Sequence, residues 1–319
     1  MMSLVLGSNS TGSSNKILSP SKCASIESLI YYLRVQFTPS AAKLKNVTAW
    51  FQKVHGLALS ILATLVFAVS TPAQSPCPFD SPDEDQLARC LIRPVKIYGN
   101  LGPEPAALPD PLKKLIGKRV KVKAKSLKRY LDAQGISEES IGGSLATPIP
   151  TARYFVIHDT SSPYLKDDPF PENINEADYR GNNLVRWAQV KVTHVYVNRL
   201  GESATASNFE TTVGATKYER RNPDRKGLFL HVELIQPRRR DPNGGPTNDA
   251  FAPEPGFTAK QLDRLALLYV AASVRRGQWL LPAFHASVDA GIPNAHDDPQ
   301  NFDLDGWLAS VERLLTELR

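Results

Sequence analysis

The spacing of hydrophobic and polar positions changes several times along this chain, and it is most regular after residue 148. Two short apolar runs, 154–157 and 228–235, predict buried strands. Residues 189–197 alternate between apolar and polar side chains, which predicts another strand, and the turn residues 198–202 predict a hairpin partner after it. These segments together indicate a sheet.

Helical spacing dominates the rest of this region. Thr258 and Gln261 form a capping box, and apolar residues then recur at helical spacing for several turns. A second apolar stripe, at 307–318, predicts a C-terminal helix. We therefore expect an α/β domain over 148–319, with a central mixed β-sheet flanked by helices.

A long apolar run, LALSILATLVFAVS, covers residues 57–70 and is preceded by Lys43, Lys45 and Lys53. Residues 1–50 are rich in Ser, Asn and Lys and have a low-complexity opening. A bilayer span needs about 20 apolar residues, whereas the core of a signal peptide needs roughly 7–15. The length predicts an export signal within a leader of residues 1–73, cleaved before Gln74; an uncleaved anchor or a buried helix is the alternative. We expect export to the periplasm or cell-wall compartment, with no transmembrane span in the mature chain.

Residues 74–147 predict an N-terminal extension with a different character. Its first part, 74–112, is rich in proline, which predicts an irregular arm. Nine Lys and Arg residues follow within 113–129, where the alternation at 119–124 predicts a strand with one solvated face, before a short helix at 126–133. The basic run is either such a solvated face or a docking surface for an anionic polymer or an envelope protein.

The net charge of +6 is unevenly distributed. The leader holds six Lys or Arg residues and one acid, a balance of +5, so the mature chain keeps a balance of +1. This small excess gives no support to nucleic-acid binding. Cys23 falls in the leader, and in an oxidising compartment the remaining pair, Cys77 and Cys90, could close a short disulfide loop; metal ligation by this pair is the weaker alternative.

Candidate chemistry lies in the histidines and acids of the α/β region. His158 closes the first predicted strand, His285 follows a later apolar run, and Asp298 precedes a proline, with Asp297 as the alternative carboxylate. Two imidazoles and one carboxylate are typical of a catalytic zinc site, because they leave the fourth tetrahedral position open. A further carboxylate must move a proton, and Glu233 is the candidate; a salt-bridged glutamate at the rim is the alternative.

The remaining histidines of this region are weaker candidates. His296 could direct an N–H at the oxyanion of a tetrahedral intermediate, or it could be an exposed loop residue. His194 and His231 are expected in the core or behind the ligands, and neither is predicted to be a ligand.

An ordered set of segments between residues 150 and 312 resembles the zinc-dependent N-acetylmuramoyl-L-alanine amidase family, the type 2 amidases related to phage lysozyme-amidases and animal peptidoglycan recognition proteins. The matching segments are Val156-Ile157-His158-Asp159-Thr160-Ser161, Thr193-His194-Val195-Tyr196-Val197 with Asn198-Arg199-Leu200-Gly201, His231-Val232-Glu233-Leu234, Phe257-Thr258 with Gln261-Leu262, Ala283-Phe284-His285, and Asp298-Pro299 with Phe302 and Trp307. The resemblance implies a type 2 amidase-like fold, and the loop 161–183 looks like an insertion in it.

The resemblance also implies a site and a reaction. The family's zinc ligands fall on His158, His285 and Asp298, its catalytic glutamate on Glu233, and its oxyanion-side lysine on His296, which is a departure. A threonine, Thr193, stands where some relatives have a catalytic tyrosine, which indicates the branch that uses glutamate alone. The implied activity is hydrolysis of the amide between N-acetylmuramic acid and L-alanine in peptidoglycan. The alternatives are a non-catalytic peptidoglycan-binding protein of the same fold and a zinc amidase acting on another exported amide.

Overall fold

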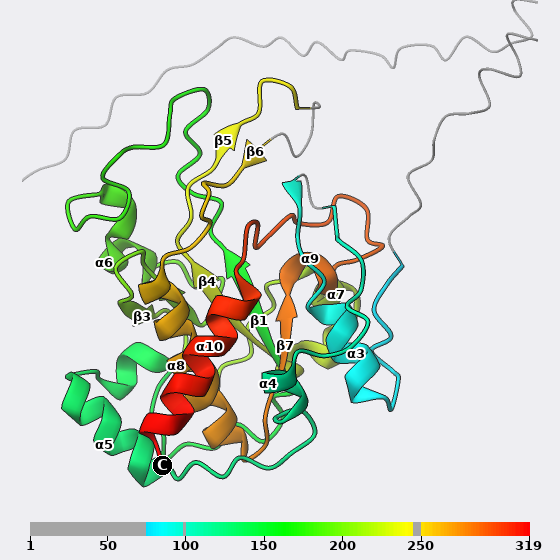
Figure 1. The fold of residues 1–319 in the computed structure, drawn as a ribbon, viewed down its shortest axis with the longest axis vertical. Coiled ribbons are helices and arrows are strands. Elements are labelled where there is room, and N and C mark those ends of the chain that lie inside the picture. The colour runs from blue at the N-terminus through cyan, green and yellow to red at the C-terminus, as the bar shows by residue number, and fades with distance from the viewer. Residues whose placement is uncertain (1–74, 98–99, 245–249) are drawn as a thin grey trace, which may run out of the picture. The chain divides into compact units, whose positions relative to one another are not determined.

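A five-stranded sheet forms the centre of the computed structural model, which describes residues 75–97, 100–244 and 250–319 (Figure 1). The export signal predicted at 57–70 lies outside these residues. The strand order is β3-β2-β4-β1-β7. Its strands are β1 (Tyr154–Asp159), β2 (Val195–Val197), β3 (Ser203–Thr205), β4 (Phe229–Leu234) and β7 (Leu281–Phe284). Because β3 alone is antiparallel to its neighbour, the sheet is mixed, as predicted.

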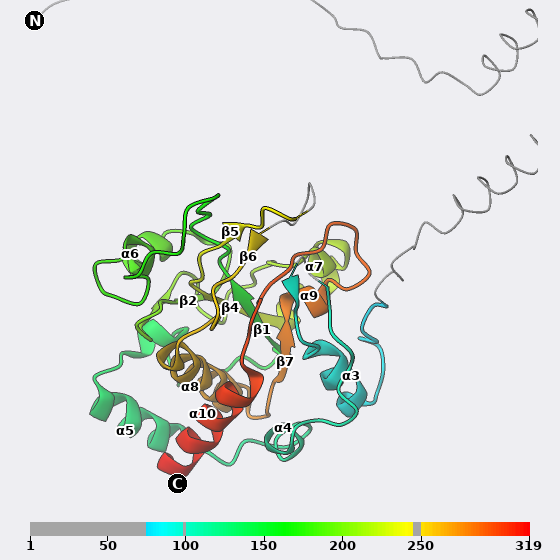
Figure 2. The same ribbon diagram turned by 45° about the horizontal axis from the view of Figure 1, so that its top comes forward.

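Helices cover the sheet, and α10 packs along α8 over one of its faces, as Figures 1 and 2 show. The α-helices are α3 (Glu84–Leu91), α4 (Asp110–Lys113), α5 (Ala124–Gln134), α6 (Leu184–Trp187), α7 (Lys217–Arg221), α8 (Ala259–Arg276), α9 (His285–Val288) and α10 (Leu304–Glu317). Short 3₁₀ turns are η2 (Glu138–Ile141), η3 (Arg180–Asn182) and η4 (Pro223–Leu228), and β5 (Arg239–Arg240) pairs with β6 (Ala250–Phe251) in a separate ribbon. The predicted capping box starts α8, and Gly277 ends it in the left-handed conformation.

The register of β1 and β4 places the site residues on one face of the sheet and a mostly apolar set of side chains on the other. Tyr154, Val156 and His158 pair with Phe229, His231 and Glu233, so these six side chains share one face of the sheet. The intervening residues of both strands are buried and apolar until Asp159, and they form the face toward α8. The two strands therefore carry aromatic rings at their amino ends and site residues at their carboxyl ends.

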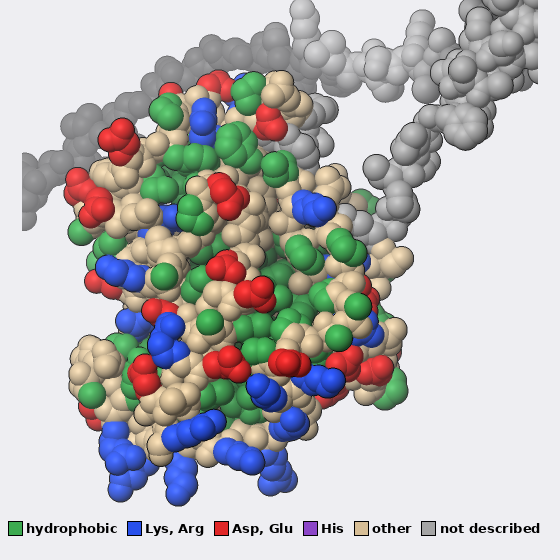
Figure 3. Space-filling model, in the orientation of Figure 1, with side chains coloured by type: hydrophobic (Ala, Val, Ile, Leu, Met, Phe, Trp, Pro, Cys, Tyr) green, Lys and Arg blue, Asp and Glu red, His purple; other side chains and the backbone are tan. Residues whose placement is uncertain are grey.

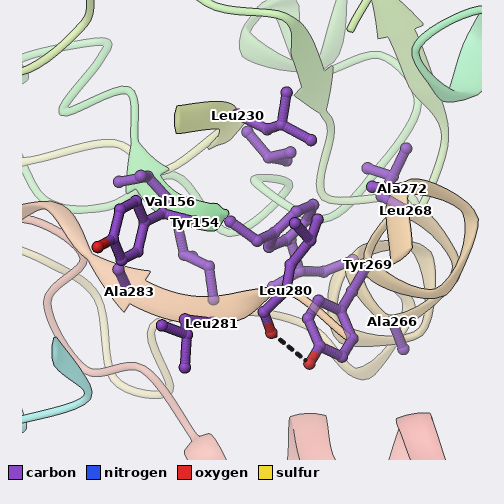
Figure 4. Close-up of a cluster of buried hydrophobic side chains, with 14 of the residues drawn as sticks. Tyr154, Val156, Leu230, Ala266, Leu268, Tyr269, Ala272, Leu280, Leu281 and Ala283 are labelled. Carbon is purple, nitrogen blue, oxygen red and sulfur yellow. Dashed lines mark hydrogen bonds between the residues drawn. The ribbon is translucent and has the colours of Figure 1, made fainter. Parts of the chain in front are cut away.

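The apolar face is held by aromatic packing around Tyr269 of α8 (Figure 4). Its ring contacts Phe155 of β1, Trp279 and Trp307, with centroids 5.3 to 5.7 Å apart. Its hydroxyl donates a hydrogen bond of 2.8 Å to the carbonyl of Leu280, so this deeply buried polar atom has a partner. Burial of each such large side chain contributes about 1.5–3 kcal/mol relative to exposure.

The segment predicted to be an irregular arm is more ordered than expected. Asp83 caps α3 by accepting from the backbone N–H groups of Asp85 and Gln86, and four of the eight helical residues are buried. Cys77 and Cys90 form the predicted disulfide. Proline-rich flanks masked this helix in the sequence, and its buried side chains join the same hydrophobic core as the sheet.

Two predicted strands were wrong in extent. Residues 189–194 precede β2 and are not part of a strand, and Val190 and Val192 within them are exposed and line a cavity. The alternation at 119–124 forms only one isolated bridge, between Arg119 and Gln278, before α5 begins. The helix predicted at 126–133 is confirmed as α5, and the predicted C-terminal helix as α10.

Among the helices of the described ranges, none has both the length and the apolar character that a membrane span requires.

Candidate metal centre

Three predicted ligands meet at the carboxyl end of the parallel strands. His158 lies near the end of β1, His285 follows β7 directly, and Asp298 comes from the loop before α10. The two Nδ1 atoms are 2.9 Å apart, and Oδ1 of Asp298 lies 3.0 Å from Nδ1 of His285. Oδ2 of Asp298 lies 3.5 Å from Nδ1 of His158, and all three residues are buried. These side chains could together hold a metal ion.

The far side of His158 is fixed by a chain of hydrogen bonds. Its Nε2 lies 3.0 Å from Nδ1 of His231, whose Nε2 lies 3.2 Å from Oε1 of Glu219. The other oxygen of Glu219 accepts from the backbone N–H groups of Ala215 and Thr216. Since a carboxylate only accepts, His231 donates from Nε2 and accepts at Nδ1, so His158 carries its proton on Nε2. Its Nδ1 lone pair therefore points into the cluster.

His285 is oriented in the same manner. Its Nε2 lies 3.2 Å from Oδ2 of Asp289, a fully buried carboxylate that also accepts from the backbone N–H groups of Lys217 and Tyr218. This partner accepts a hydrogen bond from Nε2, so Nδ1 is the ring atom that faces His158 and Asp298. Such hydrogen bonds from the outer nitrogen are the usual means of orienting a metal-binding imidazole.

The electrostatics of the cluster favour a positive charge at its centre. Burial lowers the pKa of His285, but the carboxylates of Asp298 and Asp289 outweigh it and raise that pKa to about 10. Burial and the neighbouring His285 lower the pKa of His158 to about 3. The carboxylates that attract a proton to His285 would equally attract a divalent cation. The donor set therefore fits a metal by geometry, tautomer and charge.

Asp298, and not Asp297, occupies the carboxylate position. Asp298 accepts a hydrogen bond from the backbone N–H of Asp159 at 3.3 Å, while Asp297 accepts from Gln300 and lies 3.4 Å from Arg238. Arg238 also donates to Asp159 at 2.6 Å, and both side chains are buried. Arg238 contacts both Asp159 and Asp297, and it thereby ties the loop that carries Asp298 to the end of β1.

Glu233 lies beside the cluster on β4 and lines the same cavity. Its Oε1 is 3.9 Å from Nδ1 of His158, and its Oε2 is buried without a hydrogen-bond partner in the described part of the chain. Burial, and then repulsion from Asp298, raise the pKa of Glu233 well above its usual range. A carboxylate with these properties can accept and return a proton.

His296 lies at the rim, with about half of its side chain exposed. Its ring stacks on His285 at 4.5 Å between centroids, and its Nδ1 is 3.7 Å from Oδ1 of Asp298. It lines a cavity of about 350 Å³ with the three ligands and Glu233. Apolar side chains of Trp187, Val190, Val192 and Tyr196 form another part of this lining.

The sequence did not predict the roles of several residues that support the site. Glu219 was detectable, because Thr216 and Glu219 form a capping box at the start of α7, but that pattern reveals a helix start and not a partner for His231. Arg238 and Asp289 gave no local signal. His194 and His231 lie behind the ligands as expected, with the backbone N–H of His231 donating to Nδ1 of His194 at 3.0 Å.

Comparisons of the chain with protein-family models, with curated proteins and with solved structures found no match.

Proposed function

We propose that this chain is an exported zinc hydrolase that cleaves the amide between N-acetylmuramic acid and L-alanine in peptidoglycan. The observation that carries the proposal is the convergence of three buried donor atoms beside a buried carboxylate oxygen that lacks a hydrogen-bond partner in the described part of the chain. Two imidazoles and one carboxylate form a donor set that zinc favours in catalytic sites. The ordered sequence segments that resemble type 2 amidases supply the substrate class.

His158, His285 and Asp298 would hold the ion. Bound zinc would lower the pKa of a water molecule to about 7 and polarise a carbonyl oxygen. The residues behind the ligands orient both imidazoles. His231, which Glu219 holds, accepts from Nε2 of His158, and Asp289 accepts from Nε2 of His285.

Glu233 would take a proton from the attacking water as the new carbon–oxygen bond forms. It would then deliver that proton to the departing nitrogen of L-alanine as the carbon–nitrogen bond breaks. Its raised pKa favours the protonated form, which is the form that delivers the proton to the departing nitrogen. His296, at the rim, would direct an N–H toward the carbonyl oxygen as negative charge develops there.

The cavity and the disulfide are compatible with a wall substrate. The cavity is open to solvent and combines polar groups at the ligands with the apolar side chains of Trp187, Val190 and Val192. A disulfide between Cys77 and Cys90 is typical of proteins that work outside the reducing cytosol. Both features support an exported enzyme that acts on a large substrate.

Digestion of isolated peptidoglycan by the full chain tests this function. Mass spectrometry of the soluble products should detect free stem peptides that begin at L-alanine. A chelator should abolish their release, and added zinc should restore it. Bound zinc at one ion per chain with no released peptide would contradict the proposed hydrolysis and favour the recognition protein.

A further inference from the structure

A second hollow lies at the other end of the sheet, and none of its side chains belongs to the metal centre. It measures about 780 Å³ and is lined by the segment 114–129, by Trp279 and by the end of α10. Trp279 comes shortly before β7 and His285 follows that strand, so the two sites are roughly 20 Å apart at about 3.3 Å per residue. Figure 3 shows Lys and Arg side chains gathered at this lower end of the molecule.

The rim of this basic groove is unusually rich in uncompensated charge. Seven of its lining residues between 114 and 129 are Lys or Arg, all seven are exposed, and no lining residue is acidic. Lys114 lies 3.7 Å from Glu312, while none of the other six forms an ion pair within the described part of the chain. Like charges held this close repel one another, so an anion would relieve that repulsion.

The start of α5 adds to the same positive field. Lys123 is its N-cap residue and makes no side-chain capping bond, and the first turn contains no acid. Free backbone N–H groups carry partial positive charge at a helix start, where a cation is unfavourable and an anion is stabilised. The arrangement of Lys123 and Lys125 at this helix start therefore costs stability unless a negative group lies nearby.

The apolar part of the groove is recessed. Trp279 and Leu318 are buried, and Leu115, Val122 and Leu315 are only partly exposed, so the charged side chains project beyond them. Insertion into a bilayer surface needs protruding apolar side chains, so the recessed ones here would leave only electrostatic attraction to lipid headgroups. Binding of single-stranded nucleic acid needs exposed aromatic rings on which bases stack, and the lining offers only the buried Trp279.

We propose that this groove binds a linear phosphate-bearing polymer of polyols or sugars. The basic lining consists of five Lys and three Arg residues. A flexible chain with regularly spaced phosphates matches this mostly lysine lining, because lysine acts as an adaptable point charge and does not impose the fixed geometry of arginine. Such polymers carry no bases to stack, and the disulfide places the chain among extracytoplasmic partners. The groove would keep the protein on an anionic envelope while the distant cavity remains free.

Binding of poly(glycerol phosphate) to the full chain tests this proposal, with glycerol phosphate as the monomer control. The groove variant combines Lys121→Gln, Lys123→Gln and Lys125→Gln, three exposed side chains with no hydrogen bonds recorded in the described residues. Loss of three phosphate contacts should weaken binding by about tenfold or more and reduce its dependence on salt.

A matched control removes three exposed charges outside the groove, through Lys96→Gln, Arg180→Gln and Arg221→Gln, and should bind as the unmodified chain does. Equal weakening in both variants would overturn the proposal. Tighter binding of oligothymidylate of equal charge, or retention by anionic vesicles alone, would overturn the choice of ligand. Thermal unfolding confirms that both variants are folded, and none of these readings requires turnover.

Discussion

The two ends of the sheet handle charge in opposite ways. At the carboxyl ends of the strands, the buried acids and histidines other than Glu233 have defined hydrogen-bond partners, as in the series from His158 through His231 to Glu219. At the amino ends, exposed lysines and arginines line a groove with almost no acidic partners. Buried charged groups require fixed partners because their desolvation is costly. Exposed charged groups instead act together, through the electrostatic potential that they sum to. The first end offers donor atoms that could hold one small cation, and the second carries the positive charge on which the proposed binding of an extended anion depends.

Removal of a ligand should give the largest effect. His158→Ala deletes a donor atom from the cluster, so the chain should lose its bound zinc and all detectable amidase activity. Metal analysis of the purified protein measures this directly. His296→Ala is the contrast, because that side chain lies at the rim and should leave the zinc content unchanged. Full zinc content in the His158 variant would contradict the assigned ligand set.

Glu233→Gln should separate metal binding from chemistry. The amide keeps the size of the side chain but cannot accept the proton, so kcat should fall by about 10²–10⁴-fold while zinc stays bound. Glu176→Gln, an exposed acid, is the matched control and should retain activity. A Glu233 variant with full turnover would remove this residue from the mechanism.

Glu219→Gln probes the support behind the ligands. It removes the charge that orients His231, and through it His158, so zinc affinity should fall by about 10–100-fold. Competition with a chelator of known affinity measures the change. Glu139→Gln removes an exposed charge and should have no effect. Unchanged affinity in the Glu219 variant would show that the network is not needed for orientation.

The disulfide should affect stability more than chemistry. Its removal by Cys77→Ser with Cys90→Ser should lower the free energy of unfolding by about 3 kcal/mol, given the short loop that it closes. The adjacent Phe79 ring stacks on Tyr218 of α7, so this region also supports the wall behind Asp289. Urea unfolding of the variant measures the loss, and an unchanged transition would contradict it.

The sequence was sufficient to predict the strands, helices and site residues whose local patterns agree with the fold. His158, His285, Asp298 and Glu233 all lie at the carboxyl end of the sheet, where parallel strands bring residues distant in sequence together. Val190 shows the limit of such signals, since it alternates with polar neighbours as a strand would and yet lines a cavity.

Partners that depend on tertiary structure could not be read from the chain. Asp289 and Arg238 act on the site only because turns and loops bring them to it, and neither belongs to a periodic pattern. The basic run was visible as composition, but its groove requires Trp279 and the end of α10, which lie far along the chain.

Hydrolysis of a soluble muramyl peptide tests the central claim most directly, because it requires only the metal end of the molecule. The products of N-acetylmuramoyl-L-alanyl peptide would be separated by mass spectrometry for the unmodified chain and for Glu233→Gln. We predict a new free amino terminus at L-alanine from the unmodified chain with zinc, and almost none from the variant. Cleavage at another bond, or equal cleavage by both proteins, would contradict the account.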